Sequence, residues 1–109
     1  MISFNDFKRL ELKVGKVLEA ERIAGAEKLL KLRVDLNEPG LPSGRQIVAG
    51  IAQFYEPEKL LGKQVVIAAN LEPKVLMGVE SQGMLLAAND GKPVLITTNE
   101  DVAPGSLIS

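Results

Sequence analysis

Residues 70–86 hold the side chains whose chemistry and spacing best suit a binding site. They offer two amides, a lysine and a hydroxyl, from Asn70, Lys74, Ser81 and Gln82. Gly78 and Gly83 interrupt this polar run. Apolar runs at 65–69 and 84–88 flank it, and both have the composition of strands. Because loops held on a strand scaffold commonly carry function, we predict that this segment is a binding loop.

The composition argues against catalysis. The chain has no histidine and no cysteine, so a Ser-His or Cys-His nucleophile pair is impossible and a zinc site lacks its usual ligands. Its carboxylates are scattered among lysines, and no pair lies in an apolar setting that would raise a pKa for acid–base work. No glycine-rich phosphate loop or dinucleotide fingerprint occurs. We therefore expect a binding module without a cofactor or metal, and not an enzyme.

Length and charge limit the possibilities further. A chain of 109 residues suits one domain, and 46% hydrophobic with 25% charged residues suits a globular fold. No apolar run is long enough to span a membrane, and the start lacks the features of a secretory signal, so we expect a cytoplasmic protein. The net charge of −1 counts against nucleic-acid binding. The first half is richer in basic residues, which leaves room for a local basic face.

Alternating residues predict strands that would position the binding segment. Between Leu30 and Leu36 every second residue is apolar, which leaves Lys31 and Arg33 on the other face. An earlier strand runs through residues 10–21, and Gly15 predicts a bend in it. Phe4 and Phe7 are expected to anchor the N-terminus in the core. The predicted core comprises Val14, Val17, Leu30, Leu32, Val34, Ile47, Val66 and Leu85.

The remaining elements are short. We predict strands at 46–52, 64–69 and 84–88, and a short helix near 56–61 between the first two. Asn89-Asp90-Gly91-Lys92 predicts a tight hairpin that leads into a strand at 93–97. Residues 107–108 can add a short last strand. These patterns predict an all-β domain but leave a small barrel and a sandwich as alternatives.

Several blocks in this order resemble a known family. They are L-K-V-G-K-V at 12–17, A-E-K-L-L-K-L-R-V-D at 26–35, R-Q-I-V-A-G-I-A at 45–52, P-E-K-L-L-G-K at 57–63 and A-N-L-E-P-K-V-L-M-G-V-E-S-Q-G-M-L-L at 69–86. Together they resemble the tRNA-binding domain found at the C-terminus of methionyl-tRNA synthetases and in small stand-alone tRNA-binding proteins. Each block alone is weak, but their order and spacing are specific.

The resemblance implies a fold and a function. The fold is an OB-fold, a five-stranded Greek-key barrel with a short helix between strands 3 and 4 and extra C-terminal strands. Residues 1–109 would form a single tRNA-binding OB-fold domain that recognises tRNA by shape and backbone. It would assist a methionyl-type synthetase in cis or in trans, and relatives of this type are often homodimers. Because Met1 directly precedes the domain, we expect a free-standing protein.

The resemblance also implies site residues, and each has a structural alternative. In an OB-fold, Lys31 and Arg33 lie in the usual ligand groove with Lys13 nearby, although a solvated outer face explains them too. Lys16 and Lys28 are further candidates for phosphate contacts. Asn70 either contacts RNA or satisfies backbone groups at a turn. In the family, the stretch that includes Ser81, Gln82 and Met84 lies at the RNA-binding face; otherwise Ser81 caps a strand and Met84 fills core.

Departures from the family pattern keep two rival functions open. Relatives often carry basic residues where this chain has Glu72 and Val75, so weaker and less salt-dependent RNA binding is expected. A related family of dimeric export chaperones shares the L-x-V-G opening and the P-E-x-L-x-G block. It usually lacks the G-V-E-S-Q-G-M stretch present here at 78–84, which favours tRNA. The second rival is an assembly module that binds a synthetase and no RNA.

Overall fold

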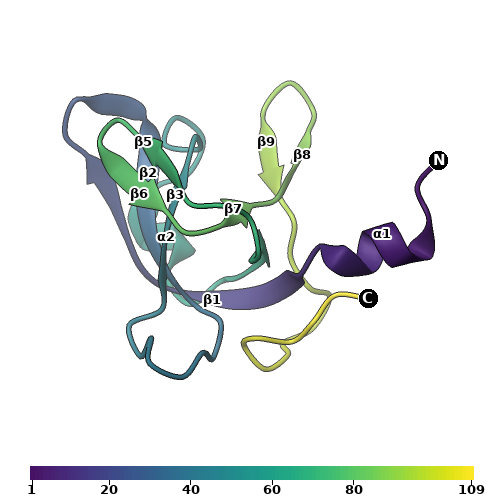
Figure 1. The fold of residues 1–109 in the computed structure, drawn as a ribbon. Coiled ribbons are helices and arrows are strands. Elements are labelled where there is room, and N and C mark those ends of the chain that lie inside the picture. The colour runs from purple at the N-terminus through teal and green to yellow at the C-terminus, as the bar shows by residue number, and fades with distance from the viewer.

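The protein, described over residues 1–109 by a computed structural model, is built around one antiparallel sheet (Figure 1). Five strands form this sheet in the order β3-β2-β1-β4-β7. Their bounds are β1 (Leu12–Ile23), β2 (Ala26–Asp35), β3 (Arg45–Ala49), β4 (Gln64–Ala68) and β7 (Met84–Leu85). The predicted all-β, OB-like fold is confirmed, because this strand order is that of a five-stranded Greek-key sheet. Neither helix of the chain is long and apolar enough to cross a membrane.

The first strand curves so that its two halves pair with different partners. Its first part pairs with β4, where Val14 lies opposite Val66, and the part from Lys16 onward pairs with β2. Gly15 lies at the junction, and a Cβ atom added there would overlap the side chains of Val34 and Leu36. The predicted bend at Gly15 is therefore a place where the sheet folds over its own core and leaves no room for a side chain.

The core lies inside the curved sheet. Leu30, Leu32, Ile47 and Ile67 are almost completely buried, as the alternating pattern predicts. Of the eight predicted core residues, seven are buried, and Leu85 is half-buried against the core cluster. The helix α2 (Pro57–Leu60) lies between β3 and β4 as predicted and buries Pro57 and Leu60.

The predicted binding loop is partly a hairpin. Strands β5 (Lys74–Leu76) and β6 (Val79–Ser81) pair with each other within the segment expected to be a loop. Met77 and Gly78 form the turn with positive φ angles of 48° and 78°, the combination typical of a type I′ turn. The pattern pointed to a turn at Gly78, but the short flanking strands gave no clear alternation.

The sheet is not closed into a barrel by backbone pairing, which differs from the closed form implied by the resemblance. Strand β3 pairs only with β2, and β7 pairs only with β4. A second hairpin, β8 (Ala87–Asn89) and β9 (Pro93–Leu95), follows β7, and its turn is the one predicted at 89–92. The tail returns to β1, where Leu107 forms a single bridge with Lys13.

A helix that was not predicted precedes the sheet. Helix α1 (Phe4–Arg9) begins with a capping box, in which the Ser3 hydroxyl accepts from the Asp6 amide and the Asp6 carboxylate accepts from the Ser3 amide. None of its residues is buried, and Phe4 is 72% exposed, so the prediction of Phe4 as a core anchor is wrong. Phe7 is half-buried. The helix extends away from the sheet, close to the C-terminus (Figure 1).

Candidate nucleic-acid interface

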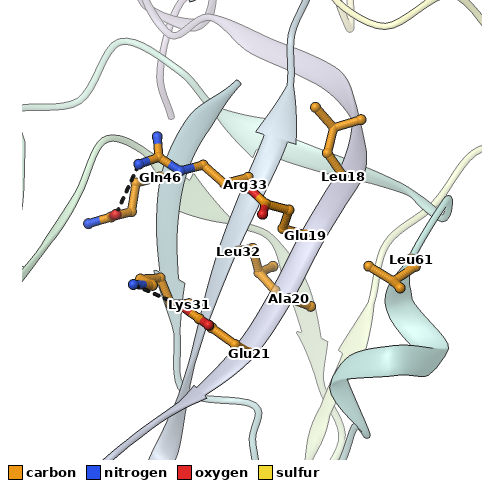
Figure 2. A pocket seen from close by; sticks show the side chains of 9 residues that line it. All are labelled: Leu18, Glu19, Ala20, Glu21, Lys31, Leu32, Arg33, Gln46 and Leu61. Atoms are coloured by element: carbon orange, nitrogen blue, oxygen red, sulfur yellow. Dashed lines mark hydrogen bonds and ion pairs between the residues drawn. The ribbon is translucent and has the colours of Figure 1, made fainter. Parts of the chain in front are cut away.

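A shallow groove of about 510 Å³ lies on the outer face of β1, β2 and β3 (Figure 2). Strand register places Glu21 opposite Lys31, and Glu19 opposite Arg33. Arg33 in turn lies opposite Gln46 of β3. Because directly opposite residues of paired strands project to the same face, these side chains form polar rows across the sheet. The structure thus brings Lys31 and Arg33 together in one groove on the outer face of the sheet.

Carboxylates balance the positive charge of this groove. The Lys31 ammonium lies 2.8 Å from a Glu21 carboxylate oxygen. The Arg33 guanidinium donates to the Gln46 side-chain oxygen and to the Gly44 carbonyl, both at 3.4 Å. A phosphate that approaches Lys31 must therefore compete with Glu21, and the groove offers less attraction for RNA than its two cations alone suggest.

The two predicted cations of β1, Lys13 and Lys16, lie outside this groove. Lys13 projects where β1 pairs with β4, and its ammonium is 3.8 Å from a Glu11 carboxylate oxygen. Lys16 is exposed at the position where β1 changes partner, opposite Asp35 of β2. The structure therefore does not gather Lys13 and Lys16 with the cations of β2.

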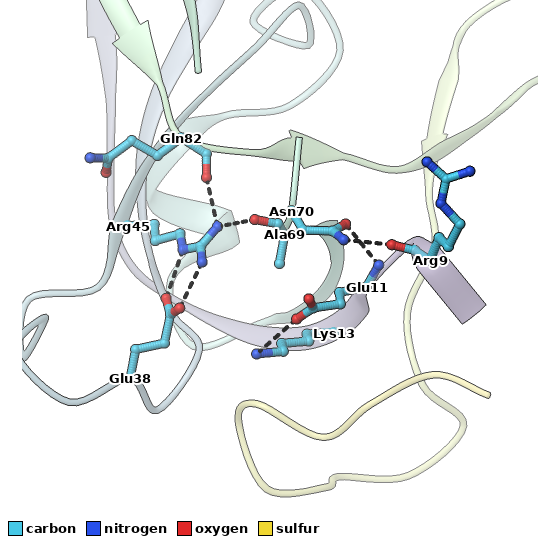
Figure 3. A network of polar contacts seen from close by, with 8 residues as sticks. All are labelled: Arg9, Glu11, Lys13, Glu38, Arg45, Ala69, Asn70 and Gln82. Carbon is cyan, nitrogen blue, oxygen red and sulfur yellow. Dashed lines mark hydrogen bonds and ion pairs between the residues drawn. The ribbon is translucent and has the colours of Figure 1, made fainter. Parts of the chain in front are cut away.

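Asn70 uses its amide to join distant parts of the chain (Figure 3). Its Oδ1 accepts from the Glu11 amide at 2.8 Å, and its Nδ2 donates to the Arg9 carbonyl at 2.6 Å. These bonds tie the end of β4 to the connection between α1 and β1. In the structure, Asn70 thus satisfies backbone groups, which was the structural alternative to RNA contact.

Ser81 and Gln82 connect β3 to the segment that leads into β7. Ser81 is only 4% exposed; its hydroxyl accepts from the Val48 amide at 2.9 Å and donates to the Gly83 carbonyl at 2.8 Å. The Gln82 side-chain oxygen accepts from the backbone N–H of Gln46 at 3.0 Å. The backbone N–H of Gln82 donates to the backbone carbonyl of Gln46 at 2.8 Å. We call this set of bonds the seam. It takes the place of the backbone ladder that is missing between β3 and β7.

Arg45 reinforces the seam and was not among the predicted site residues. Its guanidinium donates to both Glu38 carboxylate oxygens at 2.7 Å, and to the carbonyls of Ala69 and Gln82 (Figure 3). The hydrogen bonds from Arg45 lower the pKa of Glu38, against the opposing effect of burial. Its bonds to Ala69 and Gln82 span 24 and 37 residues, so no local pattern indicated them. The only indication of a role for Arg45 in the sequence was its place in the block at 45–52 that resembles the family.

Lys28 and Lys74, like Lys16, are predicted cations that form no ion pair. Lys28 and Lys74 are both exposed. Lys74 lines a hollow of about 200 Å³ together with Ser81 and the half-exposed Met84. Lys28 lines a separate cleft beside the tip of the β5–β6 hairpin. The structure thus brings Lys74, Ser81 and Met84 together, and places Lys28 next to the same hairpin.

These groups suit binding of a polar, anionic polymer. Lysines and amides bind phosphates and base edges by charge and hydrogen bonds. The exposed thioether of Met84 adds a polarizable apolar contact. No cluster of three or more acidic side chains that could hold a metal ion occurs.

Curated relatives match almost the whole chain. It is 56% identical over 106 residues to a methionine–tRNA ligase of Methanothrix thermoacetophila, and covers 15% of that protein. It is 48% identical over 109 residues to a methionine–tRNA ligase of Caldanaerobacter subterraneus subsp. tengcongensis, and covers 16% of it. The chain thus spans about one sixth of the length of the curated relatives that it matches.

Solved structures share the whole fold. A protein related to methionyl-tRNA synthetase from Pyrococcus horikoshii is 40% identical with a TM-score of 0.88, and the match covers all of this chain and 98% of that one. The chaperone CsaA from Bacillus anthracis is 33% identical with a TM-score of 0.86, over all of this chain and 99% of that one. The model of a family described as putative tRNA binding domain matches residues 12–107, and the chain belongs to that family.

Proposed function

We propose that this protein is a non-catalytic module that binds tRNA and presents it to an aminoacyl-tRNA synthetase of the methionyl type. The observation that carries the proposal is the family match over residues 12–107, which includes every strand of the sheet. Residues 1–109 act as one binding unit that holds RNA and leaves the chemistry to another domain or protein. The place of action is the cytoplasm, where tRNA is charged.

Backbone and shape recognition fit the available side chains. The free cation Lys74 contacts a phosphate beside Met84, and Lys28 contacts a second phosphate on the same side of the molecule. Lys31 and Arg33 add contacts where the RNA crosses the groove, and Lys16 lies at its margin. The chain has only three phenylalanines and one tyrosine, so stacking on single-stranded bases is a minor contribution.

The module works as a homodimer. Helix α1 buries none of its residues; its first residue, Phe4, is exposed, as are Met1 and Ile2, which precede the helix. Leu107, near the C-terminus, is also largely exposed. Large apolar side chains left exposed on a small domain are typical of an interface between subunits. A second copy covers this surface and also doubles the number of RNA contacts.

A second candidate function is binding of polypeptide chains. The observation that favours it is the similarity to the chaperone CsaA at 33% identity over the whole chain. The balanced charges of the groove and the net charge of −1 are compatible with a ligand other than RNA. We rank this candidate second because the family model that matches residues 12–107 is described as a putative tRNA binding domain.

Gel-shift titrations distinguish these functions. We expect the protein to shift bulk tRNA at lower concentration than a folded RNA of similar length that is not a tRNA. Equal affinity for both RNAs would reduce the proposal to general RNA binding. No shift with either RNA, together with binding to an unfolded polypeptide, would replace the proposed function with the second candidate.

A further inference from the structure

A cleft of about 800 Å³ lies between the tip of the β5–β6 hairpin and the β1–β2 turn. Residues 25–29 line one side and residues 75–77 line the other, and we call this the hairpin cleft. Val75 and Met77 are 63% and 69% exposed. The cleft thus presents two large apolar side chains to solvent on a hairpin that already belongs to the candidate interface.

The backbone conformation at Met77 is unfavourable for a residue with a side chain. Met77 has a φ of 48°, in the left-handed region that residues other than glycine and asparagine seldom adopt. Asparagine before glycine is the preferred pair in a type I′ turn. A methionine that is both strained and exposed contributes little to folding, and such positions are frequent where a ligand binds.

One unpaired lysine lines the cleft, and another lies on the opposite face of the hairpin, where it lines the hollow with Ser81 and Met84. Lys28 lines the hairpin cleft, and Lys74 directly precedes Val75 on β5; neither forms an ion pair. Glu27 also lines the cleft. An apolar wall with free ammonium groups nearby suits a ligand that joins a flat apolar part to anionic groups. The carboxylate of Glu27 can accept from an amino group at the edge of such a flat part.

We propose that the hairpin cleft holds one unpaired nucleobase of the bound RNA, with the adjoining phosphates at Lys28 and Lys74. This inference rests on the proposed function and names a contact within it. The base lies against Val75 and Met77, and a base with an exocyclic amino group is preferred because it can donate to Glu27. The cleft therefore contacts the base of an unpaired nucleotide, whereas the lysines contact only the phosphate backbone.

The substitution Met77→Asn tests the inference without disturbing the fold. It creates the preferred Asn-Gly turn, so the hairpin forms at least as well, while the apolar contact is lost. We expect a loss of tRNA affinity of about two- to tenfold, which corresponds to the loss of a contact between a thioether and a ring, with an unchanged dependence on salt. Affinity for a fully paired RNA duplex should stay the same. Leu41→Asn, an exposed apolar position in the loop between β2 and β3, is the matched control and should change neither affinity.

The outcomes separate this inference from the proposed function. If the wild type binds tRNA and Met77→Asn binds it equally well, the hairpin cleft holds no base, whereas the proposed function stands. Equal losses of affinity for tRNA and for the duplex would also overturn the inference. So would a Met77→Asn variant that no longer binds an unfolded polypeptide but still binds tRNA. If the wild type fails to bind tRNA, the proposed function itself fails.

A direct readout comes from the methyl groups of the methionines. The chain has three, Met1, Met77 and Met84, so a methyl-labelled sample gives few signals. A base stacked on Met77 shifts its methyl resonance upfield through the ring current. We expect this shift on addition of tRNA and not of duplex RNA. A Met77 signal that does not move with saturating tRNA would contradict the inference.

Discussion

Lys74 is the exposed cation for which the strongest effect on RNA binding is expected. It forms no ion pair, and the neighbouring positions hold Glu72 and Val75, so no nearby cation can replace it. As a phosphate contact, Lys74→Ala should weaken all tRNAs alike and lower the slope of log affinity against log salt by about one. Titrations at several salt concentrations measure both effects.

The control for this variant is Lys92→Ala, an exposed lysine at the turn between β8 and β9. It should leave affinity and slope unchanged. If Lys74→Ala behaves like this control, Lys74 only solvates its hairpin. Lys31 and Arg33 in the groove would then be the better candidates for the phosphate site.

Glu38 should make the stability of the fold depend on pH in the acid range. Its pKa is lowered from 4.5 by the hydrogen bonds from Arg45. A lowered pKa means that the carboxylate stabilises the folded state above pH 4.5, and that this contribution is lost as the pH falls through the folded value. Glu38→Gln should therefore lower the unfolding free energy at pH 7 and flatten its decline below pH 4.5. Denaturant titrations over this range measure both.

A suitable control is Glu56→Gln, which removes an exposed ion pair with Lys59. Such pairs contribute little to stability, so its unfolding free energy at pH 7 should match the wild type within about 1 kcal/mol. Equal pH profiles for Glu38→Gln and the wild type would show that the bond to Arg45 contributes nothing to acid stability.

Among the elements, β2 contributes most to the core through alternating residues. Leu32 is 1% exposed and packs in the main cluster. Leu32→Ala should lower the unfolding free energy by about 2–5 kcal/mol, because it removes buried methyl groups and leaves a cavity. Leu61→Ala, at a half-exposed position after α2, should cost less than about 0.5 kcal/mol. Similar losses for the two variants in denaturant titrations would mean that Leu32 is not a core residue.

Local pattern predicts some of these elements and not others. The alternation from Leu30 to Leu36 predicts β2, and Asn89-Asp90-Gly91-Lys92 predicts the β8–β9 turn, because both signals lie within a few residues. Helix α1 also has a local signal, because Ser3 and Asp6 have the spacing of a capping box. The hydrogen bonds by which Asn70, Ser81 and Arg45 join separate elements had no local signal, because these partners are 24 to 61 residues away.

The same distinction applies to the candidate site. Lys31 and Arg33 follow from the two-residue period of β2, since the face opposite the core must carry them. Whether each cation is free depends on neighbours brought in by folding. Lys31 forms an ion pair with Glu21 across the β1–β2 pair, whereas Lys74 forms no ion pair, although Glu72 lines the same hollow.

The whole molecule is expected to be a dimer joined through the exposed surface of α1 and the C-terminal tail. Sedimentation at micromolar concentration should give twice the chain mass of 11.7 kDa. Phe4→Asp should favour the monomer, because it places a charge in the apolar interface. It should also weaken tRNA binding, since two linked copies bind a large RNA with greater avidity.

Phe54→Asp is the matched control for this variant. Phe54 is an exposed phenylalanine outside α1 and the tail. It should leave the mass unchanged. A wild-type protein that sediments as a monomer would rule out the dimer, and a Phe4→Asp variant that stays dimeric would place the interface elsewhere.

The seam makes one edge of the sheet a place where the molecule can open locally. The amides of Gln46 and Val48 rely on the side-chain oxygens of Gln82 and Ser81, whereas Ile47, between them, faces the backbone of β2. Side-chain acceptors can rotate away without the loss of a whole strand. Amide hydrogens at 46 and 48 should therefore exchange with solvent faster than the one at 47. Slower exchange in the presence of RNA would report that the ligand holds the β5–β6 hairpin against β3.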